Sequence, residues 1–202
     1  MIYEVFFDVE TKKFFDEASS FNPEDLGVSL VSVYKRELNN DFEEVKGVMQ
    51  SFFENEIESM WNLFQDANRI IGFNSIKFDV PALKPYSPTH FPKLNHFDIL
   101  DEIRKTTGRR ISLNALSRDT LGRGKIDTGE NAIIYYKNGD PESLALLKKY
   151  CEEDVMLTRD LYDFVLKNKY LKFKDHWNNP RQIEINFAYP IDDPVNKQIG
   201  LF

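Results

Sequence analysis

Cysteine is nearly absent from the sequence, since Cys151 is the only one among 202 residues. A single cysteine excludes an internal disulfide framework and a zinc cluster of several thiolates. It fits a reducing compartment, and we expect the protein in the cytoplasm. No apolar run reaches about 18 residues, so a transmembrane helix is excluded and we expect no membrane partner. The residues after Met1 lack a basic region followed by an apolar run, and we therefore expect no signal peptide.

Positive charge is also scarce, because 26 lysines and arginines stand against 33 aspartates and glutamates and leave a net charge of −7. This balance argues against a protein that coats nucleic acid nonspecifically. The basic residues gather between Arg104 and Lys125, where seven of them accompany the single acid Asp119, so this window carries +6 and the remainder −13. Such a window is either a phosphate-contacting rim or a solvated face.

The composition, with 42% hydrophobic and 14% aromatic residues, is sufficient for the core of one large domain. Apolar and β-branched runs predict strands over 6–11, 26–34 and 69–73, with others within 42–49 and 182–187. Spacing and end signals predict helices over 54–68, 79–84, 112–121 and 140–167, and a strand-to-helix passage over 96–107. This order predicts an α/β domain with a mixed sheet over residues 1–172, followed by a C-terminal extension over 173–202.

Two carboxylates lie on the first expected strand. Because side chains alternate along a strand, Asp8 and Glu10 share one face with Phe6. Neighbouring acids on an apolar strand repel each other and lose hydration. The strand therefore either runs out into solvent or places a divalent cation between the acids, since hard cations prefer oxygen ligands.

Another acid lies on the last expected helix, whose N-terminus is marked by Asp140 as N-cap and Pro141 at the first helical position. Asp154 interrupts an apolar stripe with three- and four-residue spacing. A carboxylate on a buried face is rare unless it is paired or binds a metal. Asp154 therefore either accepts a hydrogen bond from a core group or binds a metal. Tyr150, one turn earlier, either packs or takes part in chemistry at the same site.

A fourth acid follows the strand expected over 69–73. Asp79 either caps a short helix or marks the C-terminal end of a central strand, where α/β sheets place ligands.

Together these segments resemble the three motifs of the DEDD superfamily of 3′-to-5′ exonucleases. The motifs are D-V-E at 8–10, G-F-N-S-I-K-F-D at 72–79, and Y-C-E-E-D at 150–154. The third motif resembles that of the tyrosine subtype, because it has Tyr150 four residues before Asp154 and Lys149 where the histidine subtype has histidine. The resemblance spans about residues 6–164. It implies a ribonuclease H-like fold, that is, an α/β domain with a mixed central sheet flanked by helices.

The resemblance also implies a two-metal-ion enzyme that hydrolyses phosphodiester bonds at the 3′ end of a single strand of DNA or RNA. Asp8 would bridge two Mg²⁺ ions, with Mn²⁺ as the alternative. Glu10 and Asp154 would hold the ion that activates water, and Asp79 would help to hold the other. Two such ions about 3.5–4 Å apart also stabilise charge on the phosphate. Tyr150, whose ordinary pKa is about 10, would orient the water.

Other residues are candidates for contacts with nucleic acid: Thr11, Asn74, Arg109, Arg110 and Arg123. Asn74 could equally satisfy the turn after its strand, and the first two arginines could form salt bridges to Asp101 and Glu102.

Aromatic and imidazole side chains are further candidates. Phe14 and Phe15 either stack on a terminal base or pack in the core. His90, His96 and His176 are scattered, and we expect them to be structural or surface residues.

Two other functions remain as alternatives to an exonuclease. One is a structure-specific endonuclease of the same fold, which would cut circular single strands. The other is a catalytically inactive nucleic-acid-binding scaffold. The complete set of acids argues against the scaffold, because binding alone requires no carboxylates on apolar faces.

Overall fold

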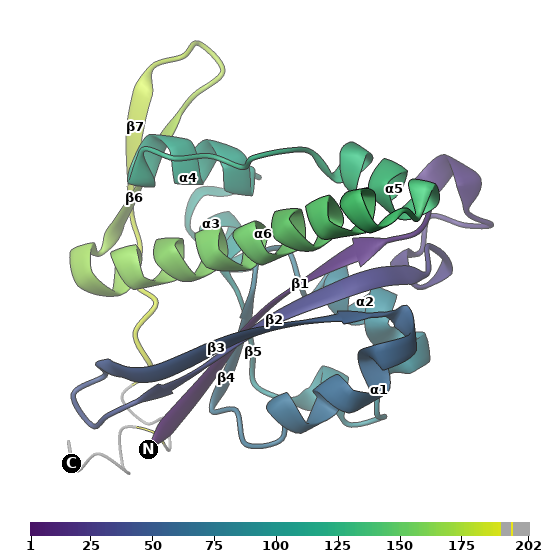
Figure 1. The fold of residues 1–202 in the computed structure, drawn as a ribbon. Coiled ribbons are helices and arrows are strands. Elements are labelled where there is room, and N and C mark those ends of the chain that lie inside the picture. Colours follow the sequence, from purple (N-terminus) through teal and green to yellow (C-terminus); the bar gives the residue numbers. More distant parts are fainter. Residues whose placement is uncertain (191–194, 196–202) are drawn as a thin grey trace.

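A five-stranded sheet in the order β3-β2-β1-β4-β5 forms the centre of the molecule in the computed structural model, which describes residues 1–190 and 195 (Figure 1). The first three strands pair antiparallel, whereas β1, β4 and β5 pair in parallel, so the sheet is mixed as expected. The strands are β1 (Ile2–Thr11), β2 (Val28–Leu38), β3 (Glu44–Phe53), β4 (Arg69–Gly72) and β5 (His96–Asp98).

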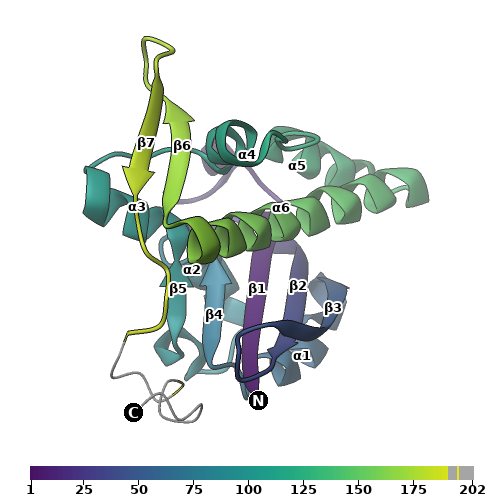
Figure 2. The same cartoon turned by 90° about the vertical axis from the view of Figure 1, so that its left-hand side faces the viewer.

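Helices cover both faces of this sheet (Figures 1 and 2). The long helix α6 crosses one face, and α3, α4 and α5 lie on the same side, whereas α1 and α2 lie on the other. The helices are α1 (Ile57–Met60), α2 (Asp79–Leu83), α3 (Ile99–Thr107), α4 (Leu113–Leu121), α5 (Gly129–Asn138) and α6 (Pro141–Asn168). The described part of the chain contains no helix long and apolar enough to span a membrane.

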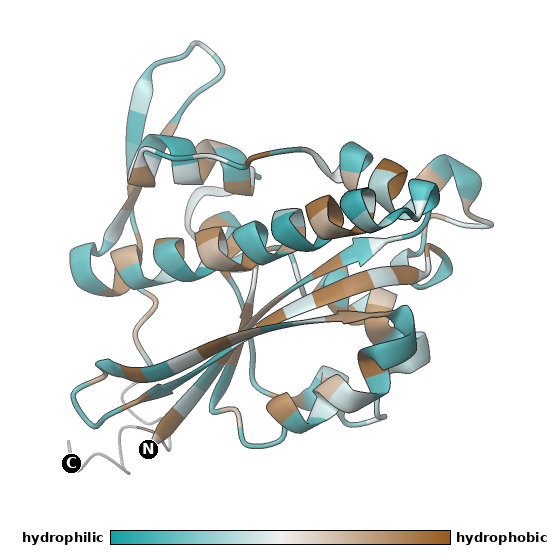
Figure 3. Cartoon of the chain, in the orientation of Figure 1, coloured by the Kyte–Doolittle hydropathy of each residue, from teal (hydrophilic) through white to brown (hydrophobic). Residues whose placement is uncertain are grey.

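Strand β1 is buried between the two helical layers. Phe6 belongs to the hydrophobic core beneath α6, whereas Phe7 belongs to the core beneath α1 and α2. This confirms the predicted alternation, in which Asp8 and Glu10 point to the same side as Phe6. Hydrophobic residues continue along the central strands, while hydrophilic and hydrophobic residues alternate along α6, as a helix covering a sheet requires (Figure 3).

Most expected helix ends are confirmed. The side chains of Asp98, Ser112 and Asp140 accept hydrogen bonds from backbone N–H groups at the starts of α3, α4 and α6. Gly108 and Gly122 end α3 and α4 in the left-handed conformation, which costs glycine little because it has no Cβ.

Two helical segments differ from expectation. The helix expected over 54–68 is wrong in length: α1 has four residues and lies between 3₁₀ turns at Glu54–Glu56 and Trp61–Leu63. Its apolar residues are nevertheless buried, because 3₁₀ turns also bring residues three apart to one side. Helix α5 was not expected; its buried residues, Ala132 and Ile133, are adjacent and give no helical period.

A second, two-stranded sheet follows α6. Strands β6 (Tyr170–Lys174) and β7 (Pro180–Glu184) form an antiparallel hairpin that extends past α4 (Figures 1 and 2). The strand expected over 182–187 therefore begins earlier, and residue 172, the expected domain end, lies within β6. The expected extension beyond residue 190 falls, apart from Val195, outside the described residues.

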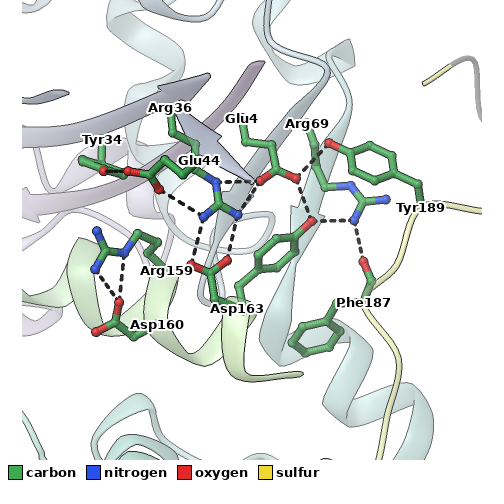
Figure 4. A network of polar contacts seen from close by, with 11 residues as sticks. Glu4, Tyr34, Arg36, Glu44, Arg69, Arg159, Asp160, Asp163, Phe187 and Tyr189 are labelled. Carbon is green, nitrogen blue, oxygen red and sulfur yellow. Dashed lines mark hydrogen bonds and ion pairs between the residues drawn. The ribbon is translucent and has the colours of Figure 1, made fainter. Parts of the chain in front are cut away.

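A buried polar network fixes the segment after this hairpin to the start of β1 (Figure 4). Glu4, with no exposed surface, accepts hydrogen bonds from Arg36 and from the hydroxyls of Tyr162 and Tyr189, the latter two at 2.9 Å. Arg69 donates to the Tyr162 hydroxyl at 2.8 Å and to the backbone carbonyl of residue 187 at 2.6 Å. Each buried charge thus has an opposite charge or a hydrogen-bond partner, which its burial requires.

Candidate active site

The four predicted acids meet in one pocket of about 320 Å³ at the C-terminal end of β1. Strand β1 contributes Asp8 and Glu10, the start of α2 contributes Asp79, and the middle of α6 contributes Asp154. Segments up to 146 residues apart in sequence therefore place four carboxylates around one cavity. The D-x-E pair does not run out into solvent, since Glu10 is 7% exposed and Asp8 lines the pocket.

Asp79 links α2 to the first strand and does not cap its helix. Phe78 occupies the N-cap position of α2, and the Oδ1 atom of Asp79 instead accepts a hydrogen bond from the backbone N–H of Val9 at 3.0 Å. Burial and the nearby charge of Asp8 raise the pKa of Asp79 well above its ordinary value. The capping interpretation is therefore wrong, and Asp79 belongs to the acid cluster.

The acids of β1 have strongly perturbed protonation. Burial, and then the charge of Asp154, raise the pKa of Asp8 to about 7. Burial and the charge of Asp8 raise the pKa of Glu10 well above its ordinary value. Carboxylates that crowd together away from water favour their neutral forms unless a cation compensates the charge. The cluster therefore has a strong electrostatic preference for positive charge.

Asp154 shows this preference most directly. It is 2% exposed, and its Oδ1 atom is buried without a hydrogen-bond partner in the described part of the chain. Its Oδ2 atom forms an ion pair with Lys125. A buried acceptor without a partner is costly, and it points to a ligand such as a hard divalent cation. The alternative of a hydrogen bond from a core group is met in part, because the buried Tyr150 hydroxyl also hydrogen-bonds to Asp154 beside the Lys125 ammonium.

Lys125 is a residue of the acid pocket that the sequence did not single out. The loop between α4 and α5 carries it into the pocket, where its Nζ atom donates to the Tyr150 hydroxyl at 3.0 Å. Its backbone N–H donates to Asn114 Oδ1 at 3.1 Å, which fixes the loop against α4. The same oxygen would lie 2.4 Å from a Cβ atom at Gly124, so the close approach requires glycine there. In the sequence Lys125 is the last residue of the basic window, and its charge alone predicts either a phosphate-contacting rim or a solvated face.

Tyr150 lies one helical turn before Asp154 and faces the same pocket, as predicted. Burial and the charge of Asp154 raise the pKa of Tyr150, so its hydroxyl keeps its proton at neutral pH. The neighbouring Cys151 is buried, and its thiol lies 3.8 Å from the Oδ2 atom of Asp8. Asp8, Glu10 and Cys151 present ligand atoms that all lie within 4.8 Å of one another.

The remaining candidates divide into two groups. Thr11 and Asn74 line the pocket, as do Phe14 and Phe15. Asn74 adopts a left-handed conformation, and its backbone N–H donates to Asp98 at 2.8 Å, so it also satisfies the turn after its strand. The alternative that Phe15 packs in the core is wrong, because its side chain is 39% exposed.

The arginines are not brought together with the acids. Arg123 forms ion pairs with Glu153 and Asp160 on α6, while Arg109 lines a second groove beside the β6–β7 hairpin. The alternative salt bridges of Arg109 and Arg110 are not formed either. Their expected acidic partners both pair with Lys105, and neither arginine forms an ion pair within the described residues.

The histidines lie outside the pocket. His96, half-buried at the start of β5, contacts the backbone carbonyl of Phe91 at 2.9 Å, and burial lowers its pKa. His176 lies on the hairpin turn against Trp177.

The mixed sheet, its flanking helices and the acids at the end of its central strand together form a ribonuclease H-like α/β fold. The family model described as the RNase H superfamily matches residues 5–166, which include all four acids and Tyr150. The chain belongs to the RNase H superfamily, and this membership indicates a nuclease-type activity with nucleic acid as substrate. A search of curated proteins found no matching relative.

Proposed function

We propose that this protein is a 3′-to-5′ exonuclease that removes nucleotides from a single strand with the help of two divalent metal ions. The observation that carries the proposal is the buried Oδ1 atom of Asp154, which has no hydrogen-bond partner among the described residues and belongs to a side chain that lines one pocket with three further carboxylates. A protein that only bound nucleic acid would gain nothing from four clustered acids, since they repel phosphate and one another.

The donor set fits hard cations. Asp8, Glu10, Asp79 and Asp154 offer only carboxylate oxygens, which suit Mg²⁺ first and Mn²⁺ second. When bound, two such ions supply an activated water and stabilise the charge on the transferring phosphate. The raised pKa values of Asp8 and Glu10 support the fit, because added positive charge would return both groups to their ionised forms.

The other side chains of the pocket have positioning roles. Tyr150 retains its proton, so its hydroxyl can donate a hydrogen bond to the attacking water but cannot act as general base. Lys125 supplies a positive charge within reach of Asp154 and Tyr150, where a non-bridging phosphate oxygen would also be stabilised.

The shape of the pocket favours a strand terminus. Its volume of about 320 Å³ lies at the small end of the range for ligand pockets, about 300–1,000 Å³, which suits one nucleotide and not a duplex. Phe14, Phe15 and Phe78 line the pocket and offer aromatic faces for a terminal base. Stacking of this kind is tolerant of sequence, because every base has a π face.

The test uses single-stranded DNA and RNA labelled at the 5′ end, incubated with Mg²⁺, Mn²⁺ or EDTA. We expect a ladder that shortens one nucleotide at a time from the 3′ end, no products in EDTA, and no cleavage of a circular single strand. Products from the circle would instead support the structure-specific endonuclease.

Variants connect this activity to the site. Asp8→Asn and Asp154→Asn should each lower the rate by several orders of magnitude and leave the fold intact. Glu153→Gln is the matched control, since Glu153 is the neighbour of Asp154 on α6 but pairs with Arg123 outside the pocket. Near-normal activity of Asp154→Asn would contradict the proposal.

A further inference from the structure

Trp177 lies exposed at the turn of the β6–β7 hairpin, which extends away from the body of the protein beyond α4 (Figure 2). Its side chain is 70% exposed, whereas the other tryptophan, Trp61, is 7% exposed and packs beneath the sheet. A single exposed hydrophobic residue needs no explanation by itself. Trp177, however, lies on an ordered turn and beside a groove with basic residues.

The turn that presents Trp177 is firmly built. Asp175 accepts hydrogen bonds from the backbone N–H groups of Trp177 and Asn179, both at 3.0 Å, and forms an ion pair with Arg181 at 2.8 Å. At the base of the hairpin, Thr120 of α4 exchanges two hydrogen bonds of 2.9 Å with the backbone of Lys172. The backbone that carries the indole ring is therefore fixed before binding, which lowers the cost of ordering this turn on a ligand.

A groove of about 340 Å³ runs between this turn and the end of α3, and we call it the hairpin groove. The hairpin lines it with Trp177, with Arg181 and with the two acids Asp175 and Glu184, and the loop after α3 lines it with Arg109. The hairpin residues 169–184 carry four basic and two acidic side chains, and within the groove Arg181 pairs with Asp175. Arg110 follows Arg109 in sequence and is exposed beside the groove, and the two arginines add two more positive charges. Because Arg109 and Arg110 form no ion pair within the described residues, their charges are available to a ligand.

We propose that the hairpin groove binds the single-stranded part of the nucleic-acid substrate at a distance from the acids. A base stacks on Trp177, and Arg109 and Arg110 contact phosphates. Aromatic faces combined with basic side chains are the arrangement that binds single strands without sequence preference. This inference rests on the proposed function, and it adds a second contact that the acid pocket does not supply.

The charge of the whole protein supports this choice of ligand. With a net charge of −7 the chain repels a polyanion, so a substrate strand requires a local basic surface. A protein partner fits less well, because interface cores bury contiguous apolar area. Trp177 is the only large exposed hydrophobic side chain within residues 104–125 and 169–184 of the described chain.

Intrinsic fluorescence provides a direct test. The full chain is titrated in EDTA, which prevents hydrolysis, with an unlabelled 20-nucleotide single strand while tryptophan emission is recorded. We expect quenching of the exposed indole in the wild type and none in Trp177→Phe, which retains only the buried Trp61.

Affinity measured by anisotropy with a labelled 20-nucleotide strand completes the test. Trp177→Ala should weaken binding by about 5- to 150-fold, the effect of losing one stacked base, and Trp177→Phe should recover most of it. Arg109→Gln with Arg110→Gln should reduce the slope of log K against log salt by about 1.4. Arg109→Gln alone should reduce the slope by about 0.7, and its charge-matched control is Lys46→Gln, an exposed site on β3 at the opposite edge of the sheet.

The two proposals fail separately. If the wild type shortens strands from the 3′ end but the Trp177 and arginine variants bind like the wild type, the hairpin groove is not a substrate site. If the strand quenches Trp177 but no shortened products appear, the exonuclease proposal fails and the nucleic-acid contact stands.

Discussion

Lys125 forms an ion pair with Asp154 inside the acid pocket, although the two residues lie 29 positions apart in sequence. The protein thus places one of its own cations against a carboxylate that we assign to metal binding. Burial would lower the pKa of Lys125, but the charges of Asp154, Tyr150 and Asp8 outweigh it, so the net pKa lies above its ordinary value and the side chain stays charged. An incoming ion must therefore compete with an ammonium group for Asp154.

This competition predicts the behaviour of Lys125→Met. Removing the ammonium should tighten Mn²⁺ binding, measured by calorimetry at pH 8, by about tenfold, which corresponds to about 1.4 kcal/mol. Lys125→Arg keeps the charge and serves as the control. Unchanged affinity in Lys125→Met would show that the ammonium and the ion do not compete for Asp154.

Tyr150→Phe separates orientation of water from metal binding. The substitution keeps the ring in its packing site and removes only the hydroxyl, so turnover should fall about 10²-fold, within the range for such aids. Metal affinity should change little, because the four carboxylates are intact. A large loss of affinity in calorimetry would instead assign the Tyr150 oxygen to the metal site.

The acid cluster predicts a pH dependence of stability in the metal-free protein. The pKa of Asp8 is about 7 in the folded state and about 3.9 in an unfolded chain. Between these values the folded protein holds a proton that the unfolded chain has released, so its stability falls as pH rises from 4 to 7.

Denaturant unfolding in EDTA at pH 5 and pH 8 measures this loss. Asp8→Asn should lose less stability than the wild type over the same interval and should be the more stable of the two at pH 8. Adding Mg²⁺ at pH 8 should restore stability to the wild type, because the ion binds only the folded state. Equal pH dependence in both proteins would place the titration on other groups.

The buried network predicts a stability effect without a catalytic one. Glu4→Gln removes the fully buried carboxylate that pairs with Arg36, which is 4% exposed and keeps its ion pair with Asp163 at 2.8 Å. Breaking a buried ion pair from one side costs about 3–5 kcal/mol. Because the pair with Asp163 remains, the loss measured by denaturant unfolding should fall toward the lower end of this range. Glu58→Gln, on the exposed side of α1, should stay within about 0.5 kcal/mol of the wild type. Turnover per folded molecule should be normal in both variants.

Local periodicity explains why the acids could be predicted. Strand alternation alone placed Asp8 and Glu10 on one face, and helical spacing alone placed Asp154 and Tyr150 on another. Each of these acids lies on an otherwise apolar face, whereas solvated acids normally lie on the polar face of their element. The sheet and most helix ends followed from equally local signals, such as Asp140 before α6 and Gly108 after α3.

The features that escaped prediction depend on tertiary geometry. Lys125 enters the pocket because Asn114 holds its loop, a contact between residues 11 apart that follows no period. A count of charges also does not show where each basic side chain points. The basic window therefore did not reveal that Arg109 lines the hairpin groove while Arg123 pairs with α6. The partner strand of β7 was missed because β6 follows α6 after a single residue.

Strand β1 carries both the buried network and two of the acids that we assign to metal binding on one face, since Glu4, Asp8 and Glu10 are separated by even numbers of residues. A shift of one residue in its pairing with β2 would turn all three carboxylates toward the opposite core, where Val5, Phe7 and Val9 now pack. Chains with that pairing error would lose the Glu4 network and bury acids among apolar side chains. The same shift in strand pairing that would misplace the acids of the pocket therefore also destabilises the fold. Folded molecules with a displaced acid cluster should be scarce.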